Sequence, residues 1–230
     1  MRTAAKGWWA RLADYVFGGK SSEPATTKGR RSRPQPFRSR LLLEPLEDRL
    51  APAQITWTGA SGVDSNWSTA KNWAPKTVPT ATDDVIFNAM NNNFSVVDAF
   101  FGGTVKTLTI EKGFTNIISL ERSLTSTTAE QNDGTISGSG TFIVPTGGTF
   151  NWLGGKQKGL GGPAYRTIIE NVATLNIADN ADKTLDGRTI NNSGRINWLD
   201  AGDLILTNEA VVDNLSGATF TAGQGAATTL

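Results

Sequence analysis

The 230-residue sequence contains no cysteine and no histidine. The lack of cysteine excludes disulfides, thiolate catalysis and cysteine-ligated metal sites, and the lack of histidine removes the commonest general base and metal ligand. Serine–histidine triads, zincin motifs and zinc deaminases are therefore excluded by composition. What remains is carboxylate, lysine or tyrosine chemistry, oxygen-ligated cations, or no catalysis.

Long hydrophobic runs are also lacking. No stretch reaches the length of a secretory h-region or of a transmembrane span. The net charge of +1 conceals a division, because the first 50 residues hold 11 basic and 5 acidic side chains, whereas the rest hold 11 basic and 16 acidic ones. The sequence thus predicts a basic tail on a mildly acidic body. The body has no basic stripe with interleaved aromatics, which argues against nucleic-acid binding.

Residues 1–53 form a targeting or sorting segment in this interpretation. Apolar and aromatic side chains recur at helical spacing over residues 6–17, which predicts a short amphipathic helix. Two explanations stay open: an anchor at a membrane or translocon, or a short helix of little consequence without a partner. Residues 20–40 are rich in Lys, Arg, Ser, Thr and Pro and nearly devoid of aliphatics, so we expect a disordered linker.

A distinctive segment follows this basic linker. Residues 41–53 read LLLEPLEDRLAPA. The segment resembles the LEPLEDR-type N-terminal sorting motif of large extracellular proteins of planctomycete bacteria. The residues that carry the resemblance are Leu43, Glu44, Pro45, Leu46, Glu47, Asp48 and Arg49. The resemblance implies export to an extracellular or cell-surface location and contact with export machinery; the alternative is an ordinary amphipathic turn.

Residues 54–130 begin with an unusual density of tryptophan. Trp57, Trp67 and Trp73 lie in a W-x-G…NW…NW…P…D-x-x-F series that resembles the opening module of autotransporter-like bacterial β-helix proteins. We predict that the three indoles cap the open end of a β-stack. The alternative is that they stack on sugar rings. Asp83 and Asp84 lack the spacing of a calcium loop and are interpreted as a solvated turn.

Residues 131–230 contain a repeat. A small-x-apolar-polar-apolar pentapeptide recurs four times, with its central apolar residue at Phe150, Leu175, Ile196 and Phe220. Other short apolar runs lie between the copies and no helical pattern intervenes, which favours a right-handed parallel β-helix with coils of about 21–25 residues. Residues 184–194 resemble filamentous-haemagglutinin-like or pectate-lyase-like coils, and the departure at residues 163–165 predicts a protruding loop. The predicted fold is all-β, with these coils continuing from the Trp-rich cap.

Two sets of side chains on the coils are candidates for a specific role. Asn171 and Asn192 share a phase and predict a ladder of stacked amides, which Asn214 would break. The charged residues at the turns are the only candidates for a polysaccharide-lyase site: Asp179, Asp182, Lys183, Asp186, Arg188, Arg195, Asp200 and Asp203. No second coil repeats a carboxylate pair in the same phase, so these side chains are interpreted as solvated turns. The sequence predicts no catalytic, cofactor-binding or metal-ligating residue.

The leading functional hypothesis is a non-catalytic, exported surface or extracellular protein with a structural or adhesin-like role. Its expected partners are export machinery and surface glycans or envelope proteins, with no nucleic acid and no transmembrane span. The alternative is a polysaccharide-binding or lyase-like β-helix protein. Because the repeat runs to residue 230 without a recognisable cap, the last coil is expected to continue in a longer protein or to pair with a partner.

Overall fold

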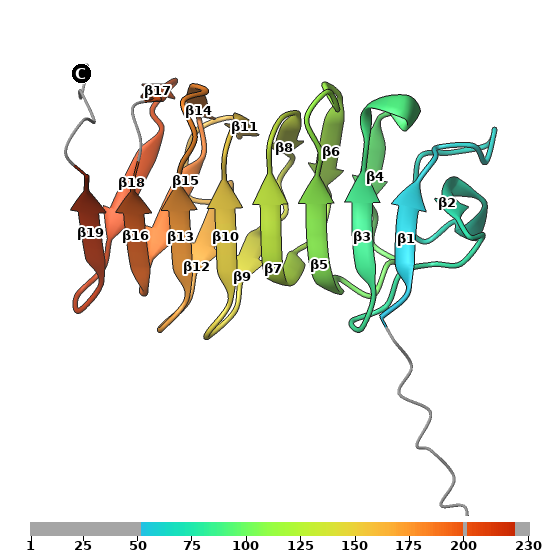
Figure 1. The fold of residues 1–230 in the computed structure, drawn as a ribbon, viewed down its shortest axis with the longest axis horizontal. Coiled ribbons are helices and arrows are strands. Elements are labelled where there is room, and N and C mark those ends of the chain that lie inside the picture. The colour runs from blue at the N-terminus through green and yellow to red at the C-terminus, as the bar shows by residue number, and fades with distance from the viewer. Residues whose placement is uncertain (1–51, 200–201, 224–230) are drawn as a thin grey trace, which may run out of the picture. The chain divides into compact units, whose positions relative to one another are not determined.

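The computed structural model describes residues 52–199 and 202–223. These residues form a parallel β-solenoid, an all-β architecture with almost no helix, as the repeat predicted (Figure 1). The sorting motif, the expected helix over residues 6–17 and the linker over residues 20–40 lie outside the described residues. No helix in the described part of the chain is both long and apolar enough to cross a bilayer.

Each coil of the middle and C-terminal part contributes three short strands, one to each of three faces. We name each face after one of its strands. The β13 face contains β1 (Gln54–Trp57), β3 (Asp84–Phe87), β5 (Thr104–Ile110), β7 (Leu124–Gln131), β10 (Thr149–Trp152), β13 (Thr174–Ile177), β16 (Arg195–Trp198) and β19 (Thr219–Ala222). The β12 face contains β9 (Phe142–Val144), β12 (Arg166–Ile169), β15 (Thr189–Asn192) and β18 (Val211–Asn214). The β14 face contains β4 (Ser95–Val97), β6 (Ile117–Leu120), β8 (Thr135–Ser137), β11 (Gly155–Lys158), β14 (Lys183–Asp186) and β17 (Leu204–Thr207).

The long strand β7 joins two of these faces. Its first residues pair with β9, whereas its last four pair with β10. The β12 and β13 faces therefore belong to one sheet, and the β14 face forms a second sheet. From β9 onward a turn separates the two strands, so that each coil gains a distinct corner.

The register of the repeat is confirmed. Phe150 pairs with Leu175, Leu175 with Ile196 and Ile196 with Phe220, all in parallel strands. Two residues further on, Trp152, Ile177 and Trp198 form the neighbouring column. Successive side chains of a strand point to opposite faces, so residues two apart, and hence both columns, point to the same side of the sheet. Both columns are buried as far as the coil that contains Ile196 and Trp198. The interior is thus built from apolar columns stacked along the solenoid.

The N-terminal end is closed by a short excursion of the chain between β1 and β3. This segment contains a 3-10 helix (Ala70–Asn72) and β2 (Trp73–Ala74), which pairs antiparallel with β1. A second 3-10 helix (Ala89–Asn91) lies between β3 and β4. The excursion is visible beside β1 in Figure 1.

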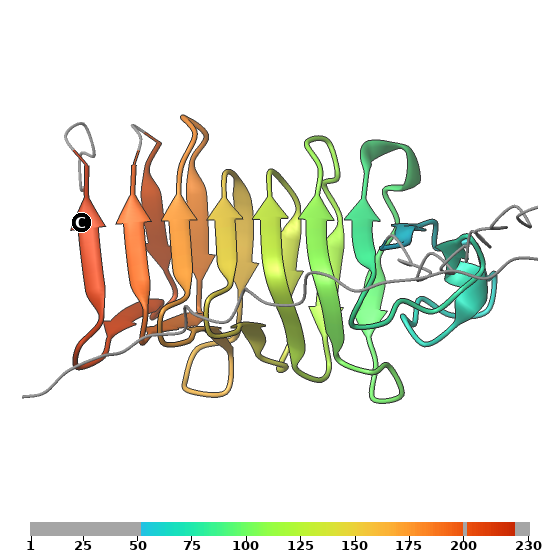
Figure 2. The ribbon, with the colours of Figure 1, turned by 60° about the horizontal axis from the view of Figure 1, so that its bottom comes forward.

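The loop between β11 and β12 leaves the line of the coils, as the sequence predicted at residues 163–165. In Figure 2 it is the gold loop that projects from the lower edge of the ribbon. Gly159 and Gly161 anchor its start, since their backbone N–H groups donate to the carbonyls of Asp186 and Gly187. The projection places Gly162 and Pro163 near the outer surface of the β12 face.

Candidate functional site

The three tryptophans of the cap are core residues. Trp57, Trp67 and Trp73 are at most 1% exposed, and the centroids of the Trp57 and Trp73 rings lie 4.8 Å apart in an edge-to-face arrangement. The Trp73 Nε1–H donates to the Trp67 carbonyl oxygen at 2.8 Å, and the Trp57 Nε1–H donates to the carbonyl oxygen of Asn93 at 3.1 Å. Because none of these three indoles presents its ring face to solvent, the carbohydrate-stacking alternative has no surface at these residues on which a sugar could lie. These rings pack over Phe87 and Phe101 and close the first coil.

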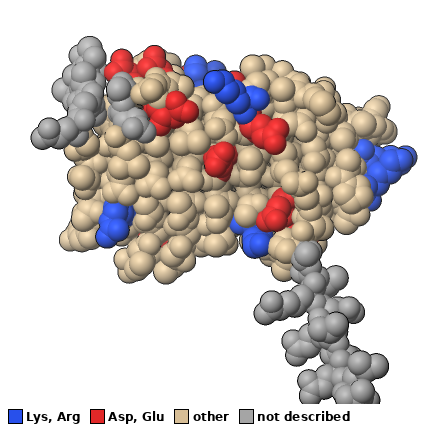
Figure 3. Space-filling model, in the orientation of Figure 1, with Lys and Arg blue, Asp and Glu red and all other residues tan. Residues whose placement is uncertain are grey.

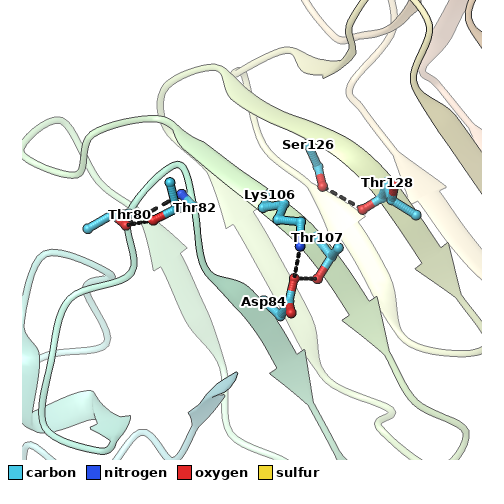
Figure 4. A network of polar contacts seen from close by, with 7 residues as sticks. All are labelled: Thr80, Thr82, Asp84, Lys106, Thr107, Ser126 and Thr128. Atoms are coloured by element: carbon cyan, nitrogen blue, oxygen red, sulfur yellow. Dashed lines mark hydrogen bonds and ion pairs between the residues drawn. The ribbon is translucent and has the colours of Figure 1, made fainter. Parts of the chain in front are cut away.

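Asp83 and Asp84 differ from each other. Asp83 is largely buried, and its carboxylate accepts hydrogen bonds from the backbone N–H and the hydroxyl of Thr80, at 2.8 and 2.6 Å. Asp84 lies on the β13 face, where it accepts from the Thr107 hydroxyl at 2.8 Å and pairs with Lys106 Nζ at 3.9 Å (Figure 4). Asp83 is therefore a largely buried residue that stabilises a turn, and its interpretation as a solvated residue is wrong. No group of three or more His, Cys, Asp or Glu residues in the described chain could hold a metal ion.

The charged residues considered for a lyase site are dispersed. Asp179 and Asp182 lie exposed in the turn before β14, Asp186 lies on the β14 face, and Arg195 is exposed on the β13 face. Asp203 donates its backbone N–H to Asp182 Oδ1 at 3.1 Å. Asp200 lies outside the described residues. The described members of this set therefore do not form a carboxylate cluster beside a basic residue on one face.

Three members of that set are buried, which corrects their interpretation as solvated turn residues. Lys183 and Arg188 are 0% exposed and Asp186 is 8% exposed. The Asn208 amide donates to Asp186 Oδ1 at 2.6 Å and lowers the pKa of the carboxyl, with further help from Lys156 and from the Thr207 hydroxyl. The Lys183 ammonium donates to the Asp179 carbonyl at 2.5 Å. Lys183 is the first residue of β14 and points inward in alternation with Leu185, whereas Arg188 lies in the turn between β14 and β15, where alternation does not apply.

Arg188 lies in the interior and binds four backbone carbonyls. Its terminal nitrogens donate to Gly138 and Lys158 oxygens at 3.3 Å each, to Gly140 oxygen at 3.1 Å and to Arg166 oxygen at 2.6 Å. These acceptors belong to different coils, so one guanidinium ties several coils together. Burial lowers the pKa of Arg188 to about 10, because desolvation penalises the charged form.

A file of polar side chains continues from Arg188 through the core. Arg188 Nε donates to the Thr167 hydroxyl at 3.0 Å, and that hydroxyl donates to Gln157 Oε1 at 2.6 Å. Gln157 Nε2 in turn donates to Gln131 Oε1 at 3.1 Å. Every member is buried and hydrogen-bonded, which is the condition under which an interior polar network is stable. The file is a structural element with no access from solvent.

The outer surface of the β13 face is dominated by threonine and asparagine. Asn197 Nδ2 donates to Asn176 Oδ1 at 3.0 Å, and Asn176 Nδ2 donates to Asn151 Oδ1 at 2.9 Å. The adjoining column contains Thr107, Thr128, Thr149, Thr174, Arg195 and Thr219. In Figure 3, which shows this face, most of the surface is uncharged, and acidic and basic side chains are scattered over it singly or in small groups. The amide ladder lies here and not at Asn171; a shorter one joins Asn192 Nδ2 to Asn214 Oδ1 at 2.7 Å, so the expectation that Asn214 breaks the ladder is wrong.

A cleft that the sequence did not indicate lies on the β12 face. It has a volume of about 430 Å³ and is lined by Arg166, Asn191, Glu209 and Asp213 together with Pro163 of the projecting loop and Val211. Residue period alone could have placed Asn191 beside Asp213 and Arg166 two strands away on the same face, because Asn191 pairs with Asp213 and Arg166 pairs with Thr189. The overhanging loop, however, brings Pro163 to the cleft in a way that no periodic pattern encodes.

These features define the protein as a parallel β-solenoid with a tryptophan-closed N-terminal end. A family model described as a domain of unknown function, DUF8693, matches residues 56–149. That segment spans the cap and the coils through the start of β10, which is less than half of the chain, and it excludes the cleft on the β12 face. Neither a curated protein nor a solved structure matches the chain.

Proposed function

We propose that this protein is a non-catalytic, exported scaffold of the cell surface or extracellular space, with an adhesin-like role in presenting its lateral faces to partners. The observation that carries the proposal is the continuous β13 face, where Thr and Asn columns cross successive coils in one register. Such a face is rigid, because each strand from β1 to β16 is hydrogen-bonded on both sides, and it offers donors and acceptors in a regular array.

The dispersion of the lyase candidates supports a role without catalysis. A β-helix lyase needs a carboxylate cluster and a basic residue on one face, whereas Asp186 lies on the β14 face and Arg195 lies on the β13 face. The guanidinium of Arg188 is buried and hydrogen-bonded to four backbone carbonyls, so it does not face a substrate at the surface. The resemblance of residues 43–49 to a sorting motif supports export.

The proposal is tested by locating the full-length chain in the cells that make it. A tagged chain is expected to be reached by protease or antibody added to intact cells. Neutralising the motif with Glu47→Gln and Arg49→Gln should retain the protein inside, whereas the matched pair Glu23→Gln and Arg33→Gln in the preceding basic stretch should not. A cytosolic wild-type product would overturn the export part of the proposal, and release of ultraviolet-absorbing unsaturated products from a polysaccharide panel would overturn the non-catalytic part.

A further inference from the structure

The cleft on the β12 face is lined by charged side chains of both signs. Arg166 lies on β12 and Asp213 on β18, with β15 between them. Two strand spacings, about 9–10 Å, separate them along the solenoid, and Asp213 lies two residues further along its strand than Val211, which is in register with Arg166. Glu209 lies in the turn before β18. Its carboxylate is close to Gly161 of the projecting loop: a methyl group added at Gly161 would lie 3.5 Å from Glu209 Oε2. The cleft thus contains one cationic and two anionic side chains, with Arg166 and Asp213 on the two outer strands and Glu209 beside the projecting loop.

None of these three charges is neutralised within the described residues. The two ion pairs found there join Lys106 to Asp84 and Lys156 to Asp186, both outside the cleft. Arg166 Nε donates to the Pro163 carbonyl, which orients the side chain toward the loop. Because a guanidinium has five N–H donors in a fixed fork, its terminal nitrogens retain the geometry that binds a carboxylate through two hydrogen bonds.

The middle of the cleft is polar but uncharged, and its wall is partly apolar. Thr189 and Asn191 of β15 lie between the two outer strands, and Pro163 and Val211 supply apolar surface. Hydroxyl and carboxamide groups both donate and accept, so they suit the alternating N–H and C=O groups of a peptide backbone. The rigid coils hold all of these groups in place before any ligand arrives, which reduces the entropy lost on binding.

We propose that this cleft binds a zwitterionic ligand, namely a short extended peptide whose carboxylate contacts Arg166 and whose ammonium group contacts Glu209 and Asp213. A polyanion would be repelled by the two carboxylates, and a simple cation would leave Arg166 unpaired. A neutral sugar would desolvate all three charges without neutralising any of them, which is unfavourable. The site is separate from the presenting role of the β13 face and does not depend on export.

The first test is a titration of the purified full chain with triglycine, followed by calorimetry or by amide chemical shifts. N-acetyl-triglycine and triglycine amide serve as probes that each lack one terminal charge. We expect triglycine to bind saturably and each capped peptide to bind about tenfold more weakly, as the loss of one charge-assisted contact implies. Added salt should weaken the binding of triglycine more than that of either capped peptide.

Variants assign each terminus of the peptide to the side chains that bind it. Arg166→Gln should make triglycine and triglycine amide bind equally, because the group that distinguishes a free carboxylate is gone. Asp213→Asn combined with Glu209→Gln should make triglycine and N-acetyl-triglycine bind equally. Arg195→Gln, which removes an exposed arginine of the β13 face, is the matched control and should leave all affinities unchanged. Melting temperatures and circular dichroism of every variant verify that the fold is intact.

The outcomes are distinct. Equal affinity of the wild type for the free and capped peptides, or the absence of saturable binding, would overturn the proposal. Displacement of triglycine by a neutral disaccharide such as cellobiose, or tighter binding of the disaccharide, would assign the cleft to sugars and would also overturn it. Neither result bears on where the protein resides, so failure of this inference is distinguishable from failure of the surface-scaffold proposal.

Discussion

The solenoid fills its interior in two ways. Under the cap, Trp57, Trp67, Trp73 and Phe87 meet in edge-to-face and stacked contacts, and shape complementarity holds the first coils together. In the middle coils, the polar file from Gln131 to Arg188 runs through the core. Apolar packing tolerates a slip of one coil against the next more readily than directional hydrogen bonds do. The comparison teaches that the cap contributes burial, whereas the polar file additionally fixes how neighbouring coils are aligned.

The largest effect is expected from truncating the cap. Trp73→Ala should lower the free energy of unfolding by about 3–5 kcal/mol, because it leaves a large cavity among the other rings and orphans the Trp67 carbonyl. Chemical denaturation of the purified protein measures the loss. Phe100→Ala is the matched control, since Phe100 is 89% exposed and should change stability little. A cap variant as stable as the wild type would show that the indoles are not needed to close the end.

A somewhat smaller effect is expected from the polar file. Arg188→Met keeps much of the volume but leaves the four carbonyl acceptors and the Thr167 hydroxyl without their donor, at a cost of about 2–4 kcal/mol. Arg195→Met, at an exposed position, is the control. If Arg188→Met were instead more stable than the wild type, the desolvation of the guanidinium would outweigh its hydrogen bonds, and packing alone would hold both regions of the core.

The smallest effect is expected on the pH dependence of stability, measured at an acidic residue of the middle coils. Gln131, Gln157 and Thr167 do not titrate, so the pH dependence of these coils is tested at Asp186 of β14. Because hydrogen bonding from Asn208 lowers the pKa of Asp186 in the folded state, its contribution to stability is present above about pH 4 and is lost as the pH falls through the folded-state value. Asp186→Asn should therefore be less stable than the wild type near neutral pH and should approach it in acid. A difference that grows on acidification would contradict this sign.

The repeat could be predicted from sequence because it has two periods: two residues along each strand, and about 21–25 residues from one coil to the next. The recurrence of Phe150, Leu175 and Ile196 at one phase fixed both the parallel register and the inward direction of these side chains. Turns between strands follow neither period: Arg188, in the turn after β14, was expected in solvent, yet it is buried. A charged residue next to a glycine reads as an exposed turn, and only the path of the chain at the corner turns it inward.

The amide ladders and the cleft show a second limit. Asn151, Asn176 and Asn197 occupy equivalent positions of the repeat, but spacing alone favoured Asn171, because spacing does not reveal which residues are paired in neighbouring strands. The cleft depends on Arg166 and Asp213 lying two strands apart and on a loop inserted in a single coil. Contacts formed once per molecule leave no periodic trace in one sequence, whatever their importance.

The coil-by-coil construction also determines how the molecule would respond to mechanical tension. A coil of roughly 21–25 residues adds about 4.8 Å to the folded length, but releases roughly 70–90 Å of contour when it is pulled out straight. Each coil contacts chiefly its neighbours, so force along the axis would detach coils in sequence rather than all at once. Arg188 donates hydrogen bonds to carbonyls of several coils, so the force needed to detach a coil should be higher at that point. A small solenoid of this kind could therefore dissipate a sudden load as stepwise extension.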